Sequence, residues 1–402
     1  MKQILEQSAN TIEYVLHQHG IDARVDGGVV SPRLFTFDLT LPPQVKRSRV
    51  NSLTEKIASE MGVASCRLTL KNGQPVLEVP RPDPSTVRLL PLYQRLDSGE
   101  FGDQSEIPGN TCLLGLDTDG SPLLLRLDGE GVGNVLLIGQ ASGGKSQLLR
   151  SMISSLALAN APEEVQLLLI DSYGKSNALR QLEGLPHLLR PIITDALDAV
   201  HHLRWLARHI EYREEQNISS PTIVVAIDDA QPLLSKHGQK FRDALTVLCQ
   251  RGPDVGIHVL LANRRPDDAI MGDSLRSNFS TRVVLRAGDA EEARQMVGTN
   301  GSGAEKLLGL GDALVVIGKE LVRMQAAMIS DSECRQLVGL LAKVQRDAAR
   351  DKQAPREEMR PRDLSARKRA SVQDDFDDDE QEQPVAVTRI HRPVARGKLR
   401  AV

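Results

Sequence analysis

The chain has 402 residues, of which 40% are hydrophobic and 26% charged, with a formal net charge of −3. This composition is typical of a globular protein with two or three domains, and it excludes an overall basic surface of the kind that binds nucleic acid non-specifically. Aromatic residues make up only 3% of the chain, so base stacking on an aromatic platform is not expected.

The cysteines and apolar segments indicate the cellular compartment of the chain. The four cysteines form no C-x-x-C pair, so we expect them to be reduced and mostly buried rather than to bind zinc. They are Cys66, Cys112, Cys249 and Cys334. No stretch approaches about 18 consecutive apolar residues, and the N-terminus begins an amphipathic helix rather than a signal peptide. We therefore expect no membrane span and a cytoplasmic protein.

Residues 1–90 are predicted to form a small α+β domain. Apolar residues recur at helical spacing from Ile4 to Leu16 and again over 45–61, which predicts two helices. Short β-like runs predict four strands, and Asn72-Gly73 between the last two favours a hairpin. The strands are 23–25, 34–41, 66–70 and 75–79.

Residues 91–345 are predicted to form a larger α/β domain. Continuous apolar runs alternate here with helical stretches, which is typical of a parallel sheet covered by helices on both faces. The runs are 134–138, 165–170, 222–227, 258–262, 282–285 and 313–317.

The segment after the run 134–138 has the pattern G-x-x-x-x-G-K-S of a phosphate loop. Its residues are Gly139, Gln140, Ala141, Ser142, Gly143, Gly144, Lys145 and Ser146. Glycines let the backbone fold around phosphate, and the first N–H groups of the following helix point at the anion. We expect Lys145 to reach the β- and γ-phosphates of ATP and the Ser146 hydroxyl to bind Mg²⁺. A glycine-rich turn that binds nothing is the alternative, but the flanking strand and helix favour a RecA-like P-loop ATPase core.

Two carboxylates end the run 222–227. Asp228 is the candidate Walker B ligand of Mg²⁺, and Asp229 is placed to orient and polarise the attacking water. The second position usually holds Glu, and Asp is shorter by about 1.5 Å, one carbon–carbon bond. A displacement of that order can cost about 100-fold in rate, so we expect slow hydrolysis or a compensating backbone shift. A strand followed by an acidic turn is the alternative.

Asn263 and Arg264 follow the run 258–262. Polar side chains at the end of a strand next to Walker B can sense a γ-phosphate, which makes both residues candidates for the catalytic site. The alternative is that they only solvate a loop.

Residues 346–402 have few apolar side chains and are predicted to form a disordered charged tail. Basic clusters at 360–362 and 367–369 precede an acidic run at 374–382 and a basic end. A solvated, self-compensating tail is one interpretation. An arm that binds DNA or a partner protein is the other, since clustered basic residues attract phosphate.

Several segments resemble the FtsK/SpoIIIE family of ring-forming DNA-translocating ATPases. Residues 303–314 (GAEKLLGLGDAL) are similar to the family pattern G-A-E-x-L-L-G-x-G-D-M-L, and residues 184–195 (GLPHLLRPIITD) to G-x-P-H-L-L-x-P-V-x-T-D. The helix over 199–213 and the segment 280–283 resemble further family segments. Residues 1–90 resemble the small domain that precedes the motor in this family.

The resemblance implies an ATP-dependent motor that assembles as a homo-hexamer and moves double-stranded DNA through its central channel. In such a ring an arginine of the neighbouring subunit, here Arg282 or Arg251, is expected to stabilise charge on the γ-phosphate. An ordinary salt-bridge role is the alternative for either arginine. Lys175 and Arg180 follow a core strand and are candidates for the channel wall.

The sequence departs from the family at the positions expected to carry out and sense hydrolysis. Asp229, Asn263 and Arg264 replace the family's Glu, Thr and Gln, and Ser172-Tyr173 replaces its Pro-Lys. The membrane region and the DNA-reading winged-helix module of the family are not expected in this chain. Two alternatives to the motor stay open: a catalytically weakened ATP-binding oligomeric scaffold, and a coupling ATPase for DNA transfer or protein secretion.

Overall fold

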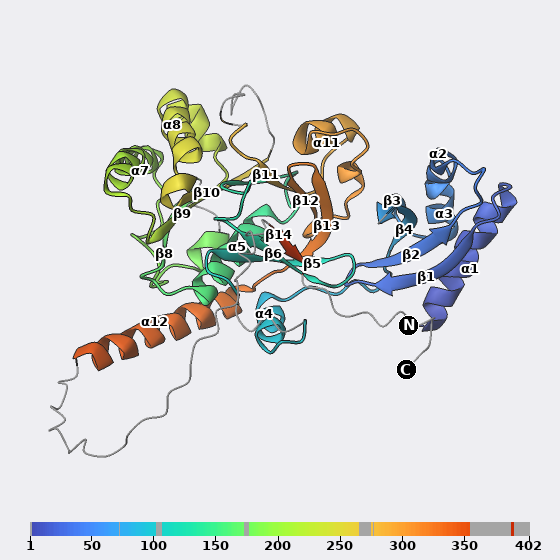
Figure 1. Cartoon of the computed structure of the whole chain (residues 1–402), viewed down its shortest axis with the longest axis horizontal. Helices are drawn as coiled ribbons and strands as arrows, with labels where there is room; N and C mark the ends of the chain where they lie inside the picture. Colours follow the sequence, from blue (N-terminus) through green and yellow to red (C-terminus); the bar gives the residue numbers. More distant parts are fainter. Residues whose placement is uncertain are drawn as a thin grey trace, which may run out of the picture.

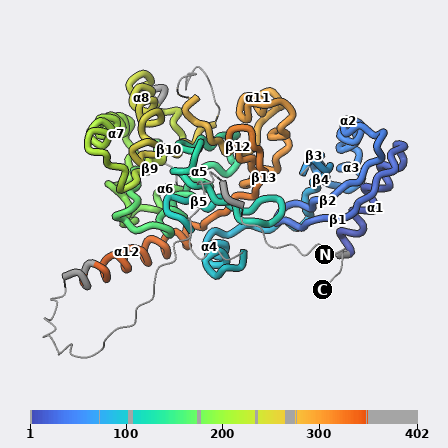
Figure 2. The backbone as a smooth tube through the Cα atoms, viewed as in Figure 1, coloured from blue at the N-terminus to red at the C-terminus, as the bar shows by residue number. Residues whose placement is uncertain are grey.

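The computed structural model describes residues 2–71, 73–101, 107–172, 177–264, 275, 277–353 and 387–389. Two bodies lie side by side (Figure 1). The small domain, residues 2–80, contains a four-stranded sheet, and the large domain, residues 89–353, is built on a ten-stranded sheet. The backbone trace shows α12 (Asp331–Gln353) projecting away from the large domain (Figure 2).

The small domain packs its helices against an antiparallel sheet with the strand order β1-β2-β4-β3. Its elements are α1 (Lys2–Gln18), β1 (Arg24–Val30), β2 (Leu34–Thr40), α2 (Arg47–Asn51), α3 (Thr54–Glu60), β3 (Arg67–Lys71) and β4 (Gln74–Pro80). Ile12 and Leu16 of α1 are fully buried, because residues one turn apart share the helix face that meets the core. The predicted α+β character and the four strands are confirmed.

The predicted helix over 45–61 is divided into two, so the prediction of one continuous helix is wrong. The break lies between Asn51 and Thr54. Ser52 Oγ donates to the carbonyl oxygen of Arg49 at 2.8 Å, and Thr54 Oγ1 donates to that of Asn51 at 2.8 Å. Such side-chain bonds compete with the helical backbone pattern, which accounts for the interruption.

The large sheet is mixed, with the order β14-β6-β5-β13-β12-β11-β7-β10-β9-β8. Its strands are β5 (Thr111–Asp117), β6 (Pro122–Arg126), β7 (Val135–Ile138), β8 (Val165–Asp171), β9 (Thr222–Asp228), β10 (Ile257–Asn263), β11 (Thr281–Val284), β12 (Asp312–Ile317), β13 (Glu320–Ala326) and β14 (Val387–Arg389). The strands β11, β7, β10, β9 and β8 are parallel, as predicted. β12 pairs antiparallel with β11, so the prediction that the run 313–317 joins a parallel sheet is wrong.

A tight turn makes β13 antiparallel to β12. Ile317 pairs with Glu320, so Gly318 and Lys319 alone connect β12 to β13. Gly318 has φ +56, a left-handed conformation that glycine adopts without steric cost. The β12–β13 hairpin then lies beside β5, and the β5–β6 hairpin extends the sheet further.

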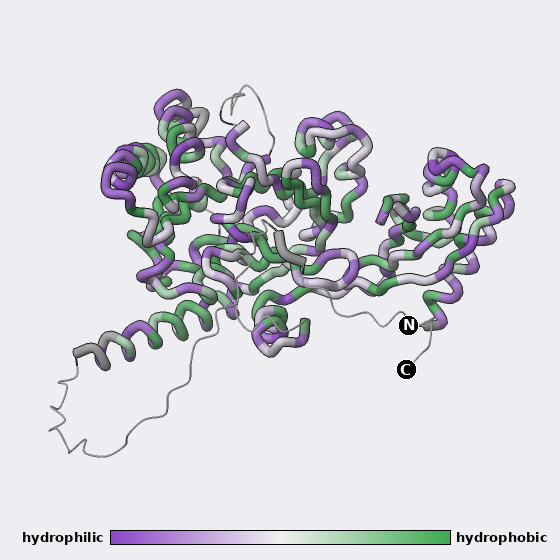
Figure 3. The backbone as a smooth tube through the Cα atoms, in the orientation of Figure 1, coloured by the Kyte–Doolittle hydropathy of each residue, from purple (hydrophilic) through white to green (hydrophobic). Residues whose placement is uncertain are grey.

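Helices cover both faces of the large sheet (Figure 1). They are α4 (Leu89–Asp97), α5 (Lys145–Ala159), α6 (Asn177–Arg180), α7 (Ala196–Gln216), α8 (Gln231–Arg251), α11 (Ala290–Val297) and α12, with short turns η1 (Pro253–Val255) and η2 (Ala304–Lys306). Leu137 of β7 lies in one hydrophobic cluster with residues of α5, whereas Leu136 lies in a second cluster with residues of α7 and α8. Neighbouring residues of a strand therefore pack into the hydrophobic cores on opposite faces of the sheet. Hydrophobic residues are concentrated in the central strands (Figure 3).

The chain beyond residue 345 departs in two places from the expected tail. α12 continues to Gln353, because its first turns are anchored by the buried residues Cys334 and Leu337. Val387–Arg389 form β14, which pairs antiparallel with β6 at the sheet edge, where β-branched residues are favoured. The rest of the predicted tail, 354–386 and 390–402, lies outside the described residues.

The four cysteines are buried and free, as predicted. Burial raises the pKa of the Cys66 thiol to about 12, which keeps it protonated at neutral pH. Within the part of the chain that the structure describes, no helix combines the length and the apolar character needed to span a bilayer.

Gly256 allows the packing at the start of β10 to be tested. Its φ is +71, and a Cβ there would lie 2.1 Å from the carbonyl oxygen of Ser219. Gly62 has φ +66, but nothing lies within 4 Å of the equivalent Cβ. We expect Gly62→Ala to lower the free energy of unfolding by about 1 kcal/mol and Gly256→Ala by about 3 kcal/mol, measured in urea. Equal losses in the two variants would contradict the close packing of Gly256 against Ser219.

Candidate functional site

The loop between β7 and α5 requires glycine at two positions. Gly139 has φ +152, and a Cβ there would lie 2.8 Å from the Cβ of Leu285. Gly144, the N-cap of α5, has φ +107, and a Cβ there would lie 3.1 Å from the amide nitrogen of Gly311. The predicted order of strand, loop and helix is confirmed, and the first N–H groups of α5 begin at Lys145, where they face the loop.

Lys145, Ser146 and Asp228 meet at the first turn of α5. Lys145 Nζ donates to the carbonyl oxygens of Gly139 and Gln140 at 2.8 and 2.9 Å. Ser146 Oγ donates to Asp228 Oδ1 at 2.9 Å. β10 separates β7 from β9 in the sheet, so the carboxyl ends of parallel strands bring Asp228 beside a loop that is distant in sequence.

The electrostatic environment of Lys145 links it to three further charged residues. Burial lowers the pKa of Lys145, Asp229 raises it, Arg264 lowers it, and Asp228 raises it by a smaller amount, with a net shift downward. Each of these groups is close enough to change the protonation energy of the lysine. The structure therefore gathers Lys145, Asp228, Asp229 and Arg264 at one end of the sheet.

The oxygen ligands at this end of the sheet suit Mg²⁺. The Ser146 hydroxyl and the Asp228 carboxylate lie 2.9 Å apart. Mg²⁺ typically takes one or two protein oxygens and completes its shell with phosphate oxygens and water. Asp228 is only 5% exposed, so a nearby cation would stabilise its charge. The residues present fit a magnesium ion that is bound together with a nucleotide.

Asp229 has a left-handed backbone, with φ +58. This conformation is uncommon outside glycine and costs roughly 1 kcal/mol or more. The Asp229 N–H donates to the carbonyl oxygen of Ala262 at 3.0 Å, and its Oδ1 accepts from the N–H of Gln231 at 3.2 Å. Its Oδ2 lies 3.5 Å from Arg264 Nε. The carboxylate is thus held by the start of α8 on one side and by Arg264 on the other.

Asn263 and Arg264 lie at the end of β10, where the sequence predicts them. Asn263 is 3% exposed and pairs in register with Ile138, the last residue of β7. The side chain of Arg264 is 54% exposed. Asn263 is therefore part of the sheet beside the loop, whereas Arg264 reaches over its surface towards Asp229.

Other predicted basic residues lie apart from this cluster. Arg282 is on β11, where its Nη1 donates to the carbonyl oxygen of Met296 at 3.2 Å near the end of α11. Arg251 ends α8 and bonds to Glu214 through Nε at 3.0 Å. Arg180 ends α6 and is exposed. The remaining channel candidate, Lys175, lies outside the described residues.

A second glycine-rich segment, residues 309–311, packs directly on the phosphate loop. The Gly311 N–H donates to the carbonyl oxygen of Gly143 at 3.1 Å. Gly309, Leu310 and Gly311 all have positive φ, at +72, +51 and +89. The local patterns used to predict the site do not include this segment, although its Gly-x-Gly sequence is a signal for such a tight loop.

The small domain also contributes to the site, which sequence patterns do not indicate. A cavity of about 610 Å³ runs from Ser142 and Lys145 to Leu310, Arg33 and residues 84–86. Arg33 belongs to the turn between β1 and β2, and residues 84–86 connect the two domains. A wall of the cavity beside the phosphate loop is therefore formed by a different domain.

Comparison with known sequences gives matches to two family models. The model described as the FtsK/SpoIIIE family matches residues 91–220, and the FtsK alpha domain matches residues 1–82. The DNA translocase FtsK of Caulobacter vibrioides is 28% identical over 380 residues, covering 82% of this chain and 45% of the relative. The DNA translocase FtsK of Vibrio vulnificus is 29% identical over 385 residues, covering 84% and 38%. The chain thus spans less than half the length of these relatives.

Solved structures share the fold. The cytoplasmic domain of the type VII secretion ATPase EccC from Thermomonospora curvata superposes with a TM-score of 0.51 and 26% identity, over 61% of this chain and 34% of that one. The pCW3 conjugation coupling protein TcpA, solved as a monomer with ATPγS, superposes with a TM-score of 0.53 and 14% identity, over 83% and 99%. The second similarity concerns the fold alone.

Gly144 provides a test of the loop as a phosphate site. A side chain there would meet the backbone of Gly311, whereas nothing lies within 4 Å of a Cβ at Gly131, which also has positive φ. Because strain of about 1–3 kcal/mol would distort the loop, we expect Gly144→Ala to weaken ATPγS binding roughly tenfold or more. The matched Gly131→Ala should bind ATPγS like the wild type in isothermal titration calorimetry. Wild-type binding by folded Gly144→Ala would contradict the assignment.

Proposed function

The chain belongs to the FtsK/SpoIIIE family, and from this premise we propose that it is an ATP-hydrolysing motor that translocates double-stranded DNA. The observation that carries the proposal is the meeting of the phosphate loop, the Ser146–Asp228 pair and Asp229 at one end of the sheet. Family membership and the names of the FtsK relatives support DNA as the substrate. A cytoplasmic location would give such a motor both ATP and DNA.

In this proposal the loop Gly139–Ser146 binds the phosphates of ATP. Its amides and the start of α5 surround the β-phosphate, and Lys145 exchanges its bonds to Gly139 and Gln140 for bonds to phosphate oxygens. Ser146 and Asp228 would hold Mg²⁺, which when bound would neutralise charge on the β- and γ-phosphates. The cavity towards Arg33 receives the rest of the nucleotide.

Asp229 is the group that orients the attacking water in this proposal. Its carboxylate already accepts from the Gln231 N–H and pairs with Arg264, so only part of its hydrogen-bonding capacity is directed at the phosphate loop. The exposed Arg264 guanidinium lies near enough to Lys145 to lower its pKa, and in this proposal it moves to the γ-phosphate and releases Asp229. We infer that hydrolysis is slow, because a short carboxylate must first be freed from an ion pair.

The assembly is proposed to be a homo-hexamer around DNA. A neighbour's arginine would complete each nucleotide site, and Arg251 and Arg282 remain the candidates. Because the chain has few aromatic residues, DNA would be held through its phosphates, and binding should be insensitive to sequence and weakened by salt. The charged segment after Gln353 is proposed as an arm for DNA or a partner protein.

A second candidate function is an ATP-binding oligomeric scaffold with little or no turnover. The Asp229–Arg264 ion pair favours it, since the pair occupies the carboxylate that is proposed to orient the attacking water. A third is a coupling ATPase for DNA transfer or protein secretion, which the fold shared with EccC and TcpA keeps open.

Steady-state ATP hydrolysis with and without double-stranded DNA tests these functions. We expect slow turnover that DNA stimulates and that Lys145→Ala abolishes, because the lysine holds the transferred phosphate. Asp229→Glu, which extends the carboxylate by one carbon–carbon bond, should raise the rate, by up to about 100-fold if position is the main limitation. Asp243→Glu, the same change on the exposed face of α8, should leave the rate unchanged.

Two outcomes would contradict the motor. Absence of turnover in the wild type and in Asp229→Glu, together with ATP-dependent assembly, would support the scaffold. Turnover that DNA does not stimulate but a translocated polypeptide or a transfer protein does would support a coupling ATPase.

A further inference from the structure

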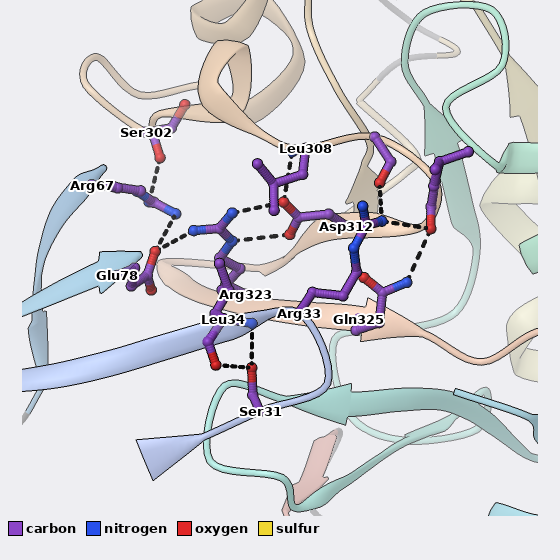
Figure 4. Close-up of polar contacts among 12 residues, drawn as sticks. Ser31, Arg33, Leu34, Arg67, Glu78, Ser302, Leu308, Asp312, Arg323 and Gln325 are labelled. Atoms are coloured by element: carbon purple, nitrogen blue, oxygen red, sulfur yellow. Dashed lines mark hydrogen bonds and ion pairs between the residues drawn. The ribbon is translucent and has the colours of Figure 1, made fainter. Parts of the chain in front are cut away.

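Four charged side chains, three of them buried and Arg67 partly buried, meet where the small domain contacts the large domain (Figure 4). Arg323 of β13 forms two parallel bonds to Asp312 of β12, from Nε to Oδ1 at 2.9 Å and from Nη2 to Oδ2 at 2.6 Å. Its remaining nitrogen, Nη1, donates to Glu78 of the small domain. Arg67, also of the small domain, lies 3.9 Å from Glu78 through Nη1. The cluster has two positive and two negative groups and is neutral overall.

Because three of these charged side chains are buried, each needs its partners close by. The side chains of Arg323, Glu78 and Asp312 are 6%, 4% and 4% exposed. Burial alone lowers the pKa of Arg323, but the carboxylates of Asp312 and Glu78 outweigh that effect and the net shift is upward. A charged group removed from water in this way needs its partners in place, so separation of the domains would leave Arg323 with an incomplete set.

The same aspartate shapes the segment that packs on the phosphate loop. Asp312 Oδ2 accepts from the Leu308 N–H at 2.7 Å, and the Asp312 N–H donates to the carbonyl oxygen of Gly309 at 3.1 Å. These bonds close a tight loop over residues 308–311, which we call the wall loop. Its Gly311 N–H donates to the carbonyl oxygen of Gly143. A short chain of bonds therefore connects Glu78 of the small domain to the phosphate loop.

Arg33 makes a second connection to the wall loop. Its Nη1 donates to the carbonyl oxygens of Gly309 and Leu310 at 2.8 and 3.2 Å. Gln325 Nε2 donates to the same Leu310 carbonyl at 3.0 Å. Leu310 has φ +51, a conformation that a residue other than glycine keeps only when its surroundings hold it. Two donors on one carbonyl, one of them from the small domain, supply that constraint.

We propose that the docked small domain positions the wall loop against the phosphate loop, with Arg323 and Arg33 as positioning residues, so that domain docking and nucleotide binding strengthen each other. The inference rests on the proposed function only in taking the ligand of the cavity to be ATP. Its physical basis is that Arg33, the wall loop and Lys145 line one cavity. Coupling of this kind is reciprocal: if docking raises the affinity for nucleotide, nucleotide must stabilise docking by the same factor.

Binding of ATPγS with Mg²⁺ to the full chain, measured by calorimetry, tests the coupling. Glu78→Gln removes the charge that the small domain presents to Arg323, and Arg33→Met removes the direct bonds to the wall loop. We expect each variant to raise the Kd of ATPγS about tenfold, within the usual range of coupling between sites. Lys71→Met is the matched control, because Lys71 pairs with Asp119 across the same interface without touching the wall loop.

The control separates coupling from domain stability. Lys71→Met should leave the Kd within about twofold of the wild type. If the interface were purely structural, all three substitutions would lower the melting temperature and none would change the Kd. An unchanged Kd in folded Glu78→Gln and Arg33→Met would overturn the proposal. A wild type that binds no ATPγS would overturn the proposed function and this inference together.

Hydrogen exchange gives a second measurement, in which the deciding comparison is between the wild type with and without nucleotide. Saturating ATPγS with Mg²⁺ should slow amide exchange in β4 (Gln74–Pro80), which carries Glu78 but does not contribute to the cavity lining. Lys145→Ala, as the control, should show no such slowing. Exchange in β4 that is identical with and without bound nucleotide in the wild type would overturn the proposal.

Discussion

The backbone contact of Gly311 with Gly143 and Gly144 sets the geometry on which the candidate nucleotide pocket depends. The Gly311 N–H donates to the carbonyl oxygen of Gly143 at 3.1 Å, and the Gly311 carbonyl oxygen accepts from the Ala326 N–H at 2.8 Å. The parallel half of the sheet, which provides the phosphate loop, is thereby joined to the antiparallel half, which carries the interface with the small domain. A side chain at Gly144 would push these parts apart, because its Cβ would lie 3.1 Å from the amide nitrogen of Gly311.

Much of the fold can be predicted from short-range patterns, and what cannot is the direction and partner of each strand. The central strands read as continuous apolar runs because both of their faces are buried, and β7, β8, β9, β10 and β11 are predicted correctly. An apolar run does not show direction, so β12 is wrongly predicted as parallel. It runs antiparallel to β11 and forms a hairpin with β13 through the two-residue turn at Gly318 and Lys319. The break between α2 and α3 depends on side-chain bonds of Ser52 and Thr54 that helical periodicity does not show.

The candidate site, like the fold, can be predicted only in part from the sequence. Gly139–Ser146 and Asp228 can be recognised because each is a contiguous signal whose role depends on local backbone geometry. The ion pair between Asp229 and Arg264, and the wall that Arg33 and the wall loop build, arise from residues that only the folded chain brings together. The sequence shows that Asp229 and Arg264 are unusual for the family, and the structure adds that they bind each other. The contiguous parts of the candidate site are thus predictable from sequence, and the contacts between residues that are distant in sequence are not.

The central claim, that ATP turnover by this chain moves DNA, is tested most directly by displacement of a third strand. A triplex-forming oligonucleotide is bound near one end of a linear duplex, and its release is followed over time after protein and nucleotide are added. The account predicts release by the wild type with ATP and Mg²⁺, and no release with ATPγS or with Lys145→Ala. Hydrolysis of ATP in the presence of the duplex while the third strand stays bound would contradict it.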